Sequence, residues 1–383
     1  MIYLDNAATS FPKPPGTVRA VYDFLVNTGA NPGRSGHEMS ISAARIVYET
    51  RDLINTFFNG PDPLRVVFTH NATYALNMAL KGMLSPGCRV VTTSIEHNAV
   101  MRPLRSLEKK GVMVKTVLCR HDGTLEPADI EKALTQKTDM IVMSAASNVT
   151  GAVMPVREVG KIAHNRCIPF LVDAAQAGGA VEIDMEFDYI DMLAFTGHKS
   201  LYGPPGTGGI IFGKDIDVSK IDPLIEGGTG SNSDTEYQPS VMPDRFESGT
   251  PNAAGIAGLK AGVEWVIEKG RENILKREQH LASILIEGLS SIRGVTVYGP
   301  SDINERTGVV SFTMDGIEVS DIGGILDTEY GIMTRVGLHC APSAHKTTDT
   351  FPSGTVRMSI GAFTEEPEID KAVAAVRAIA KRI

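Results

Sequence analysis

Short apolar runs alternate with stretches of helical spacing from about residue 15 to residue 245, and this alternation restricts the fold more than any other feature of the chain. A strand, a helix and a second strand make a βαβ unit, and successive units build a mostly parallel sheet. We therefore predict an α/β fold. The apolar runs predict seven strands in one sheet, at residues 65–69, 89–93, 112–118, 140–144, 170–173, 192–196 and 208–212. Helical spacing predicts helices at 74–83, 98–110, 126–133 and 156–165.

The last third of the chain has a different pattern. A Gly-, Ser-, Asn- and Asp-rich segment at 225–244 predicts a long surface loop, and a helical stretch at 252–289, broken near Gly270, follows it. Beyond it the pattern predicts strands at 294–298, 309–314, 332–336 and 355–360, with helices at 319–330 and from Glu366. Because 383 residues exceed the commonest domain size of roughly 100 to 150, we expect two domains. They are a large domain, 15–250, and a smaller α+β C-terminal domain, 251–383, to which the N-terminal segment 1–14 also belongs.

Composition narrows the classes of function. Lys and Arg number 37 and Asp and Glu 45, a net charge of −8, so we expect no basic face for nucleic acid. No apolar stretch approaches the roughly 18 residues of a membrane span, and the N-terminus lacks a signal-peptide pattern, so we expect no membrane partner. The four cysteines are sparse and unpaired in spacing, which favours a reducing, cytoplasmic location. For Cys88, Cys119 and Cys167 we expect small buried side chains.

Lys199 is the strongest candidate for chemistry. It stands in Gly197-His198-Lys199-Ser200, directly after the predicted strand 192–196, and open α/β sheets bind ligands at the carboxyl ends of their strands. A lone lysine is usually a solvated surface charge. Here small residues, hydroxyls and a Gly/Pro-rich run surround it, as close approach of a ligand requires. A lysine that forms a Schiff base with pyridoxal 5'-phosphate (PLP) has these needs.

Other strand ends offer partners for the same ligand. Asp173 ends the strand 170–173, and a carboxylate there holds a pyridine nitrogen protonated, although an Asp at a strand tip also serves as a plain helix cap. Gln176 can direct a donor at the ring's phenolate oxygen. His97 can cover the ring face, and Asn148 can bond its substituents; each is also ordinary as a surface or turn residue. The strand-to-helix turn at Ala72 and Thr73 presents free N–H groups that suit a phosphate.

Six motifs occur in order along nearly the whole chain. They are Tyr3-Leu4-Asp5-Asn6-Ala7-Ala8, Glu96-His97-Asn98, Ser147-Asn148-Val149-Thr150-Gly151, Asp173-Ala174-Ala175-Gln176, Gly197-His198-Lys199 and Phe246-Glu247-Ser248-Gly249-Thr250-Pro251-Asn252. As an ordered set they resemble the signatures of cysteine desulfurases, which are fold type I PLP enzymes of the aminotransferase class V group. The resemblance implies the fold type I PLP-transferase architecture and a homodimer.

The resemblance also implies roles for single residues. Lys199 is the implied Schiff-base lysine, Asp173 the partner of the pyridine nitrogen, and His97 the residue stacked on the ring. Gln176 is implied near the phenolate. Around the phosphate it implies Thr73, Thr196 and His198, with Thr250 reaching it from the second subunit.

The C-terminal motif Arg335-Val336-Gly337-Leu338-His339-Cys340 resembles the active-site cysteine segment of desulfurases with the pattern Arg-x-Gly-x-His-Cys. Cys340 lies among Gly, Ala and Pro, so we expect it on an exposed loop where a thiolate can be stabilised. Arg357 matches the family's substrate-carboxylate arginine, whose guanidinium fork grips a carboxylate bidentately. Arg34 is a further candidate, at the mouth of the site.

The motifs and the resemblance therefore predict a PLP-dependent cysteine desulfurase that converts L-cysteine to L-alanine and leaves the sulfur on Cys340 as a persulfide. A sulfur-acceptor protein or a small thiol must then take the sulfur, for uses such as iron–sulfur cluster assembly. Three alternatives stay open: a selenocysteine lyase acting on L-selenocysteine, another class V aminotransferase or β-elimination lyase, and a binding or regulatory protein without activity.

Overall fold

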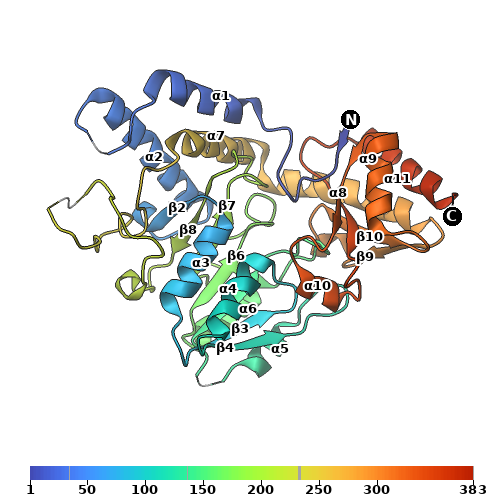
Figure 1. Ribbon diagram of the computed structural model, residues 1–383, viewed down its shortest axis with the longest axis horizontal. Helices are drawn as coiled ribbons and strands as arrows, with labels where there is room; N and C mark the ends of the chain where they lie inside the picture. Colours follow the sequence, from blue (N-terminus) through green and yellow to red (C-terminus); the bar gives the residue numbers. More distant parts are fainter. Residues whose placement is uncertain (34, 136, 232–233, 383) are drawn as a thin grey trace.

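A seven-stranded sheet forms the centre of the larger part of the molecule (Figure 1). The computed structural model describes residues 1–33, 35–135, 137–231 and 234–382. Across the sheet the strands are β2 (Val66–Thr69), β8 (Gly208–Phe212), β7 (Met192–Thr196), β6 (Phe170–Asp173), β5 (Met140–Ser144), β3 (Arg89–Thr93) and β4 (Met113–Val117). Only the pairings of β8 in this described sheet are antiparallel. The predicted mostly parallel, seven-stranded α/β fold is confirmed.

Helices cover both faces of this sheet because its strands are apolar on both sides. In β7, Leu193 and Phe195 join the core on one face, while Met192 and Ala194 join the core on the other. Helices α3 (Ala72–Met83) and α4 (Asn98–Glu108) cover the second face, and α2 (Glu38–Phe57), α5 (Pro127–Ala133), α6 (Val156–Asn165) and α7 (Ala253–Lys269) cover the first. Helix α1 (Pro15–Asp23) packs against α7. We call this sheet with these helices the large unit.

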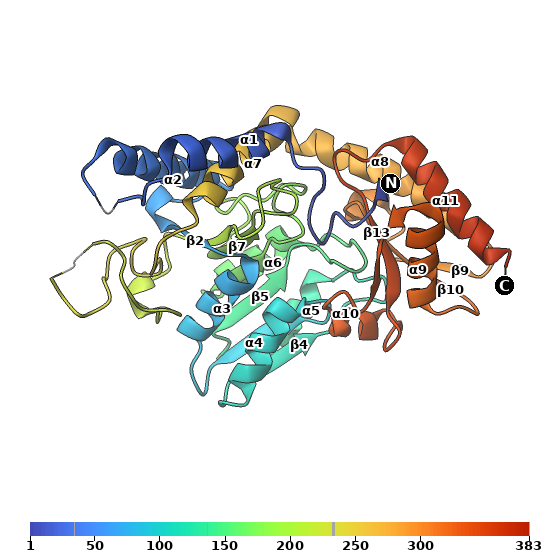
Figure 2. The same cartoon turned by 45° about the horizontal axis from the view of Figure 1, so that its top comes forward.

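A second, smaller unit holds a four-stranded antiparallel sheet. Its strands, in order, are β12 (Arg335–Gly337), β13 (Thr355–Ser359), β10 (Val309–Met314) and β9 (Val295–Tyr298), and the helices α8 (Arg271–Ser290), α9 (Val319–Tyr330) and α11 (Glu366–Ala380) share its core. The short helix α10 (Pro342–Thr347) extends from this unit toward the edge of the large sheet (Figure 2). The domain limits predicted from the sequence, 15–250 and 251–383 with 1–14, stay a prediction.

Two predicted elements, at 252–289 and 332–336, are each divided into two in the structure. The helical stretch predicted at 252–289 divides at Gly270, whose φ of +79° suits glycine, into α7 in the large unit and α8 in the small one. The prediction of a single strand at 332–336 is wrong, because the chain leaves one sheet and enters another at Thr334. Strand β11 (Ile332–Met333) pairs in parallel with the N-terminal β1 (Ile2–Tyr3), whereas β12 pairs with β13.

The cysteines differ from the expectation. Cys88 and Cys119 are only partly buried, and Cys167 is exposed, so the prediction of a buried side chain is wrong for Cys167. Cys167 follows the end of α6 in the left-handed region, with φ of +53°, in a turn that leads to β6. None of the helices in the described part of the chain combines the length and apolar character needed to cross a bilayer.

The loop that follows β5 joins the two units. Four successive carbonyl groups of this loop accept hydrogen bonds from the small unit: Asn148 from Arg357 Nη1 (3.1 Å), Val149 from Ser311 Oγ (2.6 Å), Thr150 from Arg306 Nη2 (3.2 Å) and Gly151 from the Thr307 amide (2.9 Å). Arg306 is 1% exposed and also donates to the carbonyls of Pro300 and Val309. The small unit therefore fixes the backbone beside Asn148.

Replacing Arg306 by alanine should lower the free energy of unfolding by about 3 to 5 kcal/mol, because several buried carbonyls would lose a charged donor. Urea denaturation of the purified protein measures this change. Arg382→Ala is the control, since Arg382 pairs with Glu329 on the surface and its loss should change stability little. Equal stability of the two variants would contradict this role of Arg306.

Candidate active site

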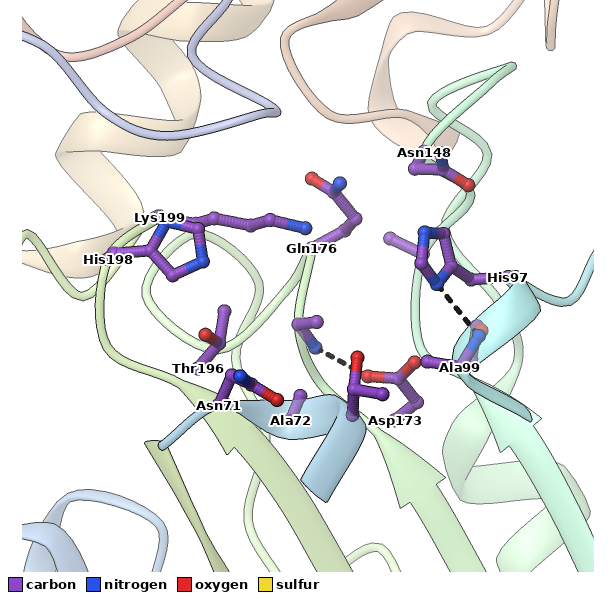
Figure 3. Close-up of a pocket in the computed structure, with 14 residues that line it drawn as sticks. Asn71, Ala72, His97, Ala99, Asn148, Asp173, Gln176, Thr196, His198 and Lys199 are labelled. Atoms are coloured by element: carbon purple, nitrogen blue, oxygen red, sulfur yellow. Dashed lines mark hydrogen bonds between the residues drawn. The ribbon is translucent and has the colours of Figure 1, made fainter. Parts of the chain in front are cut away.

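A pocket lies in the large unit, at the carboxyl ends of the parallel strands (Figure 3). Nine of the residues predicted from the sequence line it: Ala72, Thr73, His97, Asn148, Asp173, Gln176, Thr196, His198 and Lys199. Each stands at or just after the end of a strand, or at the start of the helix that follows. Parallel strands end at one edge of a sheet, so residues far apart in sequence meet there.

Lys199 follows β7 and reaches into this pocket (Figure 3). Burial lowers the pKa of its ammonium to about 8; Arg357 and Arg335 add to the lowering, and Asp173 opposes it. A lysine with such a pKa is neutral in roughly a tenth of molecules at pH 7, far more than an ordinary lysine. Lys199 can therefore act as a nucleophile or as a base.

Asp173 ends β6 and is 4% exposed. Its carboxylate accepts a hydrogen bond from the Ala175 amide at 2.9 Å. Burial raises the pKa of Asp173, and this hydrogen bond and Lys199 lower it in part. A carboxylate in this position can hold a protonated ring nitrogen by a charge-assisted hydrogen bond.

His97 caps α4. Its Nδ1 accepts a hydrogen bond from the Ala99 amide at 3.0 Å, drawn as a dashed line in Figure 3. Burial, followed by the charge of Lys199, lowers the pKa of His97 to about 4. The ring is therefore neutral, and because Nδ1 accepts, Nε2 carries the proton. Burial and Lys199 likewise lower the pKa of His198 to about 4.

One end of the pocket is suited to an anion. The N-terminus of α3 opens there with Ala72 and Thr73, and helix N-termini attract anions. The Thr196 hydroxyl is buried nearby without a hydrogen-bond partner. Gly208 lets β8 pass close to this turn, because a Cβ there would lie 2.8 Å from Asn71 Cα. A bound phosphate would supply the partner that Thr196 lacks.

Cys340 lies in a strained turn between β12 and α10. His339 and Cys340 both have positive φ, +47° and +59°, and Cys340 is exposed. Two hydrogen bonds hold this turn to the large unit: the Asn98 amide donates to the Cys340 carbonyl (2.8 Å) and Asn148 Nδ2 to the His339 carbonyl (2.7 Å). Arg335 Nη2 donates to Cys340 Sγ at 3.4 Å.

Arg357 lies on β13 and is 1% exposed. Its Nη2 pairs with Asp5 Oδ1 at 2.8 Å, its Nη1 donates to the Asn148 carbonyl, and its Nε is buried without a partner. Gln176, which also faces the pocket, donates from Nε2 to the Ala7 carbonyl at 3.1 Å. The N-terminal segment thus forms one wall of the site.

Of the other predicted site residues, Cys340, Arg357 and Thr250 do not line this pocket. Thr250 is exposed and lines a neighbouring hollow with His70 and Tyr74. Arg34 lies outside the described residues. Two further residues of the site, Asp5 and Arg335, had no predicted role, although each stands in a family-like motif. The structure shows their roles, because it pairs Asp5 with Arg357 and Arg335 with Cys340. Among the described residues, no group of three or more His, Cys, Asp or Glu side chains could hold a metal ion.

Comparison with known proteins agrees with this geometry. The sequence profile of the aminotransferase class-V family matches residues 2–372. This chain belongs to the aminotransferase class-V family.

Relatives of this class-V chain carry a more specific description. The probable cysteine desulfurase of Methanothermobacter thermautotrophicus is 35% identical over 96% of this chain and 92% of its own. The apo structure of the cysteine desulfurase from Thermococcus onnurineus NA1 superimposes with a TM-score of 0.93 at 32% identity, covering 100% of this chain and 95% of that one. The cysteine desulfurase CsdA from Escherichia coli gives a TM-score of 0.88 at 27% identity, with 99% and 94% coverage.

The low pKa of His97 predicts a pH effect on stability. The unfolded chain takes up a proton on this ring near pH 6.5, whereas the folded protein resists it until about pH 4. The apoprotein should therefore lose stability relative to His97→Asn as the pH falls from about 6.5 to 4, and the difference should be constant above about pH 7.5. Asparagine keeps the helix cap.

Denaturant unfolding of both proteins across this range measures the difference. His280→Asn, at an exposed position on α8, is the matched control and should show a much smaller dependence. A stability difference for His97→Asn that does not vary with pH would rule out a buried, neutral ring.

Proposed function

We propose that this protein is a PLP-dependent cysteine desulfurase, which converts L-cysteine to L-alanine and leaves the sulfur on Cys340 as a persulfide. The observation that carries the proposal is the position of Cys340. It is an exposed thiol with a guanidinium at its sulfur, in a turn bonded to the site that holds Lys199 and Asp173. The desulfurase relatives support the same reaction.

The residues of the pocket fit PLP. The unpartnered Thr196 hydroxyl, with Ala72, Thr73 and His198, would hold the phosphate at the N-terminus of α3. Asp173 would bind the pyridine nitrogen, Gln176 and Asn148 the ring substituents, and His97 the ring face. Lys199 would carry the Schiff base. When bound, PLP supplies an electron sink for the electrons released at the amino acid's Cα.

Arg357 and Lys199 bind and deprotonate the substrate in this proposal. Arg357 offers its buried, unpartnered Nε to the α-carboxylate, and its charge fixes the amino acid in one orientation. Lys199, with its pKa lowered to about 8, takes the Cα proton and can return it. Asp5 holds the guanidinium from the other side.

Cys340 receives the sulfur. Its thiolate attacks the sulfur of L-cysteine, so that an S–S bond forms as the substrate C–S bond breaks, and the substrate carbon gains a proton to give the methyl group of alanine. L-cysteine and one thiol yield L-alanine and one persulfide, so no external oxidant is needed. The Arg335 guanidinium donates to Sγ at 3.4 Å and would attract the negative charge of the attacking sulfur.

Partners and location complete the proposal. A sulfur-acceptor protein or a small thiol removes the sulfur in the cytoplasm, for uses such as iron–sulfur cluster assembly. A homodimer agrees with the position of Thr250, which lines a hollow outside its own pocket, and with exposed apolar residues on the N-terminal helices, among them Val18, Tyr22 and Tyr48. The large domain, 15–250, would bind the cofactor, and 251–383 with 1–14 would carry Cys340 and Arg357.

The alternatives have less support. The curated relatives and solved structures described above are cysteine desulfurases, so a selenocysteine lyase is not favoured. A plain aminotransferase would have no use for a thiol held beside the pocket by Arg335.

Cys340→Ala should bind PLP at Lys199 but form no alanine and sulfide from L-cysteine in the presence of a reductant. Quantification of both products beside the wild-type protein, in which they should be equal, tests this. Cys167→Ala, at the other exposed cysteine, is the matched control and should keep full activity. Alanine formation by Cys340→Ala at the wild-type rate would exclude a persulfide on this residue.

Arg357→Lys should raise KM for L-cysteine by roughly 10- to 100-fold, because the point charge of an ammonium replaces the planar guanidinium that binds the carboxylate. Steady-state kinetics with cysteamine, which lacks the carboxylate, give the comparison. The variant should lose little toward this poor substrate. An unchanged KM would place the carboxylate elsewhere.

A further inference from the structure

Glu96 is a buried carboxyl group that the reaction above does not use. It is 0% exposed and stands between β3 and α4, directly before His97. The Thr93 hydroxyl lies 2.5 Å from one of its oxygens, and the Ser144 hydroxyl and amide lie 2.7 and 3.0 Å from the other. These contacts bind the turn that carries His97 to the end of β5.

The same contacts bring Glu96 close to Asp173. Ser144 is the register partner of Asp173 in the pairing of β5 with β6. The ion pairs of the buried arginines in the described part of the chain go to Glu247 and Asp5, and none goes to Glu96. Glu96 thus bonds the register partner of Asp173, and in the described part of the chain Lys199 acts as a neighbouring cation on Asp173, whereas no arginine pairs with Glu96.

The remaining neighbours of Glu96 bring no compensating charge. Cys119, which follows β4, is a thiol with a pKa raised by burial to about 11 and is neutral. His97, on the same turn, is neutral. Helix α10 contributes the hydroxyl of Thr347, which reaches the turn through Ser94. An ionised Glu96 would therefore be desolvated and repelled by Asp173.

We propose that Glu96 is a positioning residue that works as a neutral carboxylic acid, which holds the His97 turn on β5 and leaves Asp173 as the charged carboxyl group of the pocket. As an acid it donates its proton to a neighbouring hydroxyl and accepts from the Ser144 amide, so all its contacts are kept. This inference rests on the proposed function, because it concerns the same site.

Loss of this proton falls in the range where enzymes work. Burial, with repulsion from Asp173, raises the pKa of Glu96 to about 7, although its hydrogen bonds to Thr93 and Ser144 lower it in part. Above this pH a second negative charge arises next to Asp173. The absorbance of the bound cofactor should then change with a midpoint near pH 7, and Glu96→Gln should remove that change, because glutamine imitates the neutral acid.

The test begins with the apoprotein, so it does not depend on the reaction. An acid whose pKa is raised on folding costs stability as the pH increases from its unfolded value to its folded value. Between about pH 5 and 8, the folding equilibrium constant of the wild type should fall relative to that of Glu96→Gln by on the order of tenfold to a hundredfold. Glu108→Gln, at the exposed end of α4, is the matched control and should show no such trend.

A constant ratio between pH 5 and 8, or a ratio that moves in favour of the wild type, would overturn the proposal. Should Glu96→Gln not fold, the infrared spectrum of a 13C-glutamate-labelled Glu278→Gln protein replaces it. This background removes Glu278, another buried glutamate, whose pKa burial raises to about 8. A labelled carboxylic-acid band that disappears between about pH 6 and 8 supports the proposal, and its absence at pH 6 refutes it.

Failure of the proposed function would look different. A protein that shows the expected stability trend but forms no alanine from L-cysteine keeps the neutral Glu96 and loses the desulfurase assignment. A protein that forms alanine through Cys340 and shows no trend loses only the assignment of Glu96.

Discussion

The site depends on the hydrogen bonds that the small unit makes to the loop after β5. Four consecutive carbonyls, from Asn148 to Gly151, are bound by groups of the small unit. Without these hydrogen bonds Asn148, which also holds the Cys340 turn, would have no fixed position relative to Lys199. Buried polar groups must be paired, so the two units cannot separate here without exposing these carbonyls and their donors to water or leaving them without partners.

Burial acts on the charges of the site in a consistent direction. It lowers the pKa of Lys199, His97 and His198, and raises that of Asp173 and Glu96. Desolvation disfavours the charged form of every group, so a lysine becomes a usable base and an unpaired acid keeps its proton. The cations that stay charged are arginines, whose pKa is too high for burial to neutralise them. In this site they lie where an anion is expected: Arg357 for a carboxylate and Arg335 for the Cys340 thiolate.

Much of the fold was predictable because it follows local rules. Strands β3, β5, β6, β7 and β8 begin and end where the apolar runs predicted, and the break at Gly270 was visible as a glycine in a helical pattern. The predictions that failed did so because tertiary contacts and turn geometry decided the outcome. The run 332–336 has the composition of one strand, but Thr334 separates two strands that pair in different sheets. The exposure of Cys167 depends on a left-handed turn that composition does not reveal.

The sequence alone determined the type of sheet, the positions of its strand ends and the presence of Lys199, Asp173, His97 and Cys340 in recognisable motifs. These are properties of short segments, since periodicity and turn residues act locally. Only the tertiary structure decided that Asp5 pairs with Arg357, that Arg335 reaches Cys340, and that Glu96 bonds Ser144, the register partner of Asp173. The contacts of Asp5 with Arg357 and of Glu96 with Ser144 join segments that are far apart in the chain, and the turn after β12 brings Arg335 to Cys340. Packing of the sheets and units sets their distances, and no local pattern encodes it.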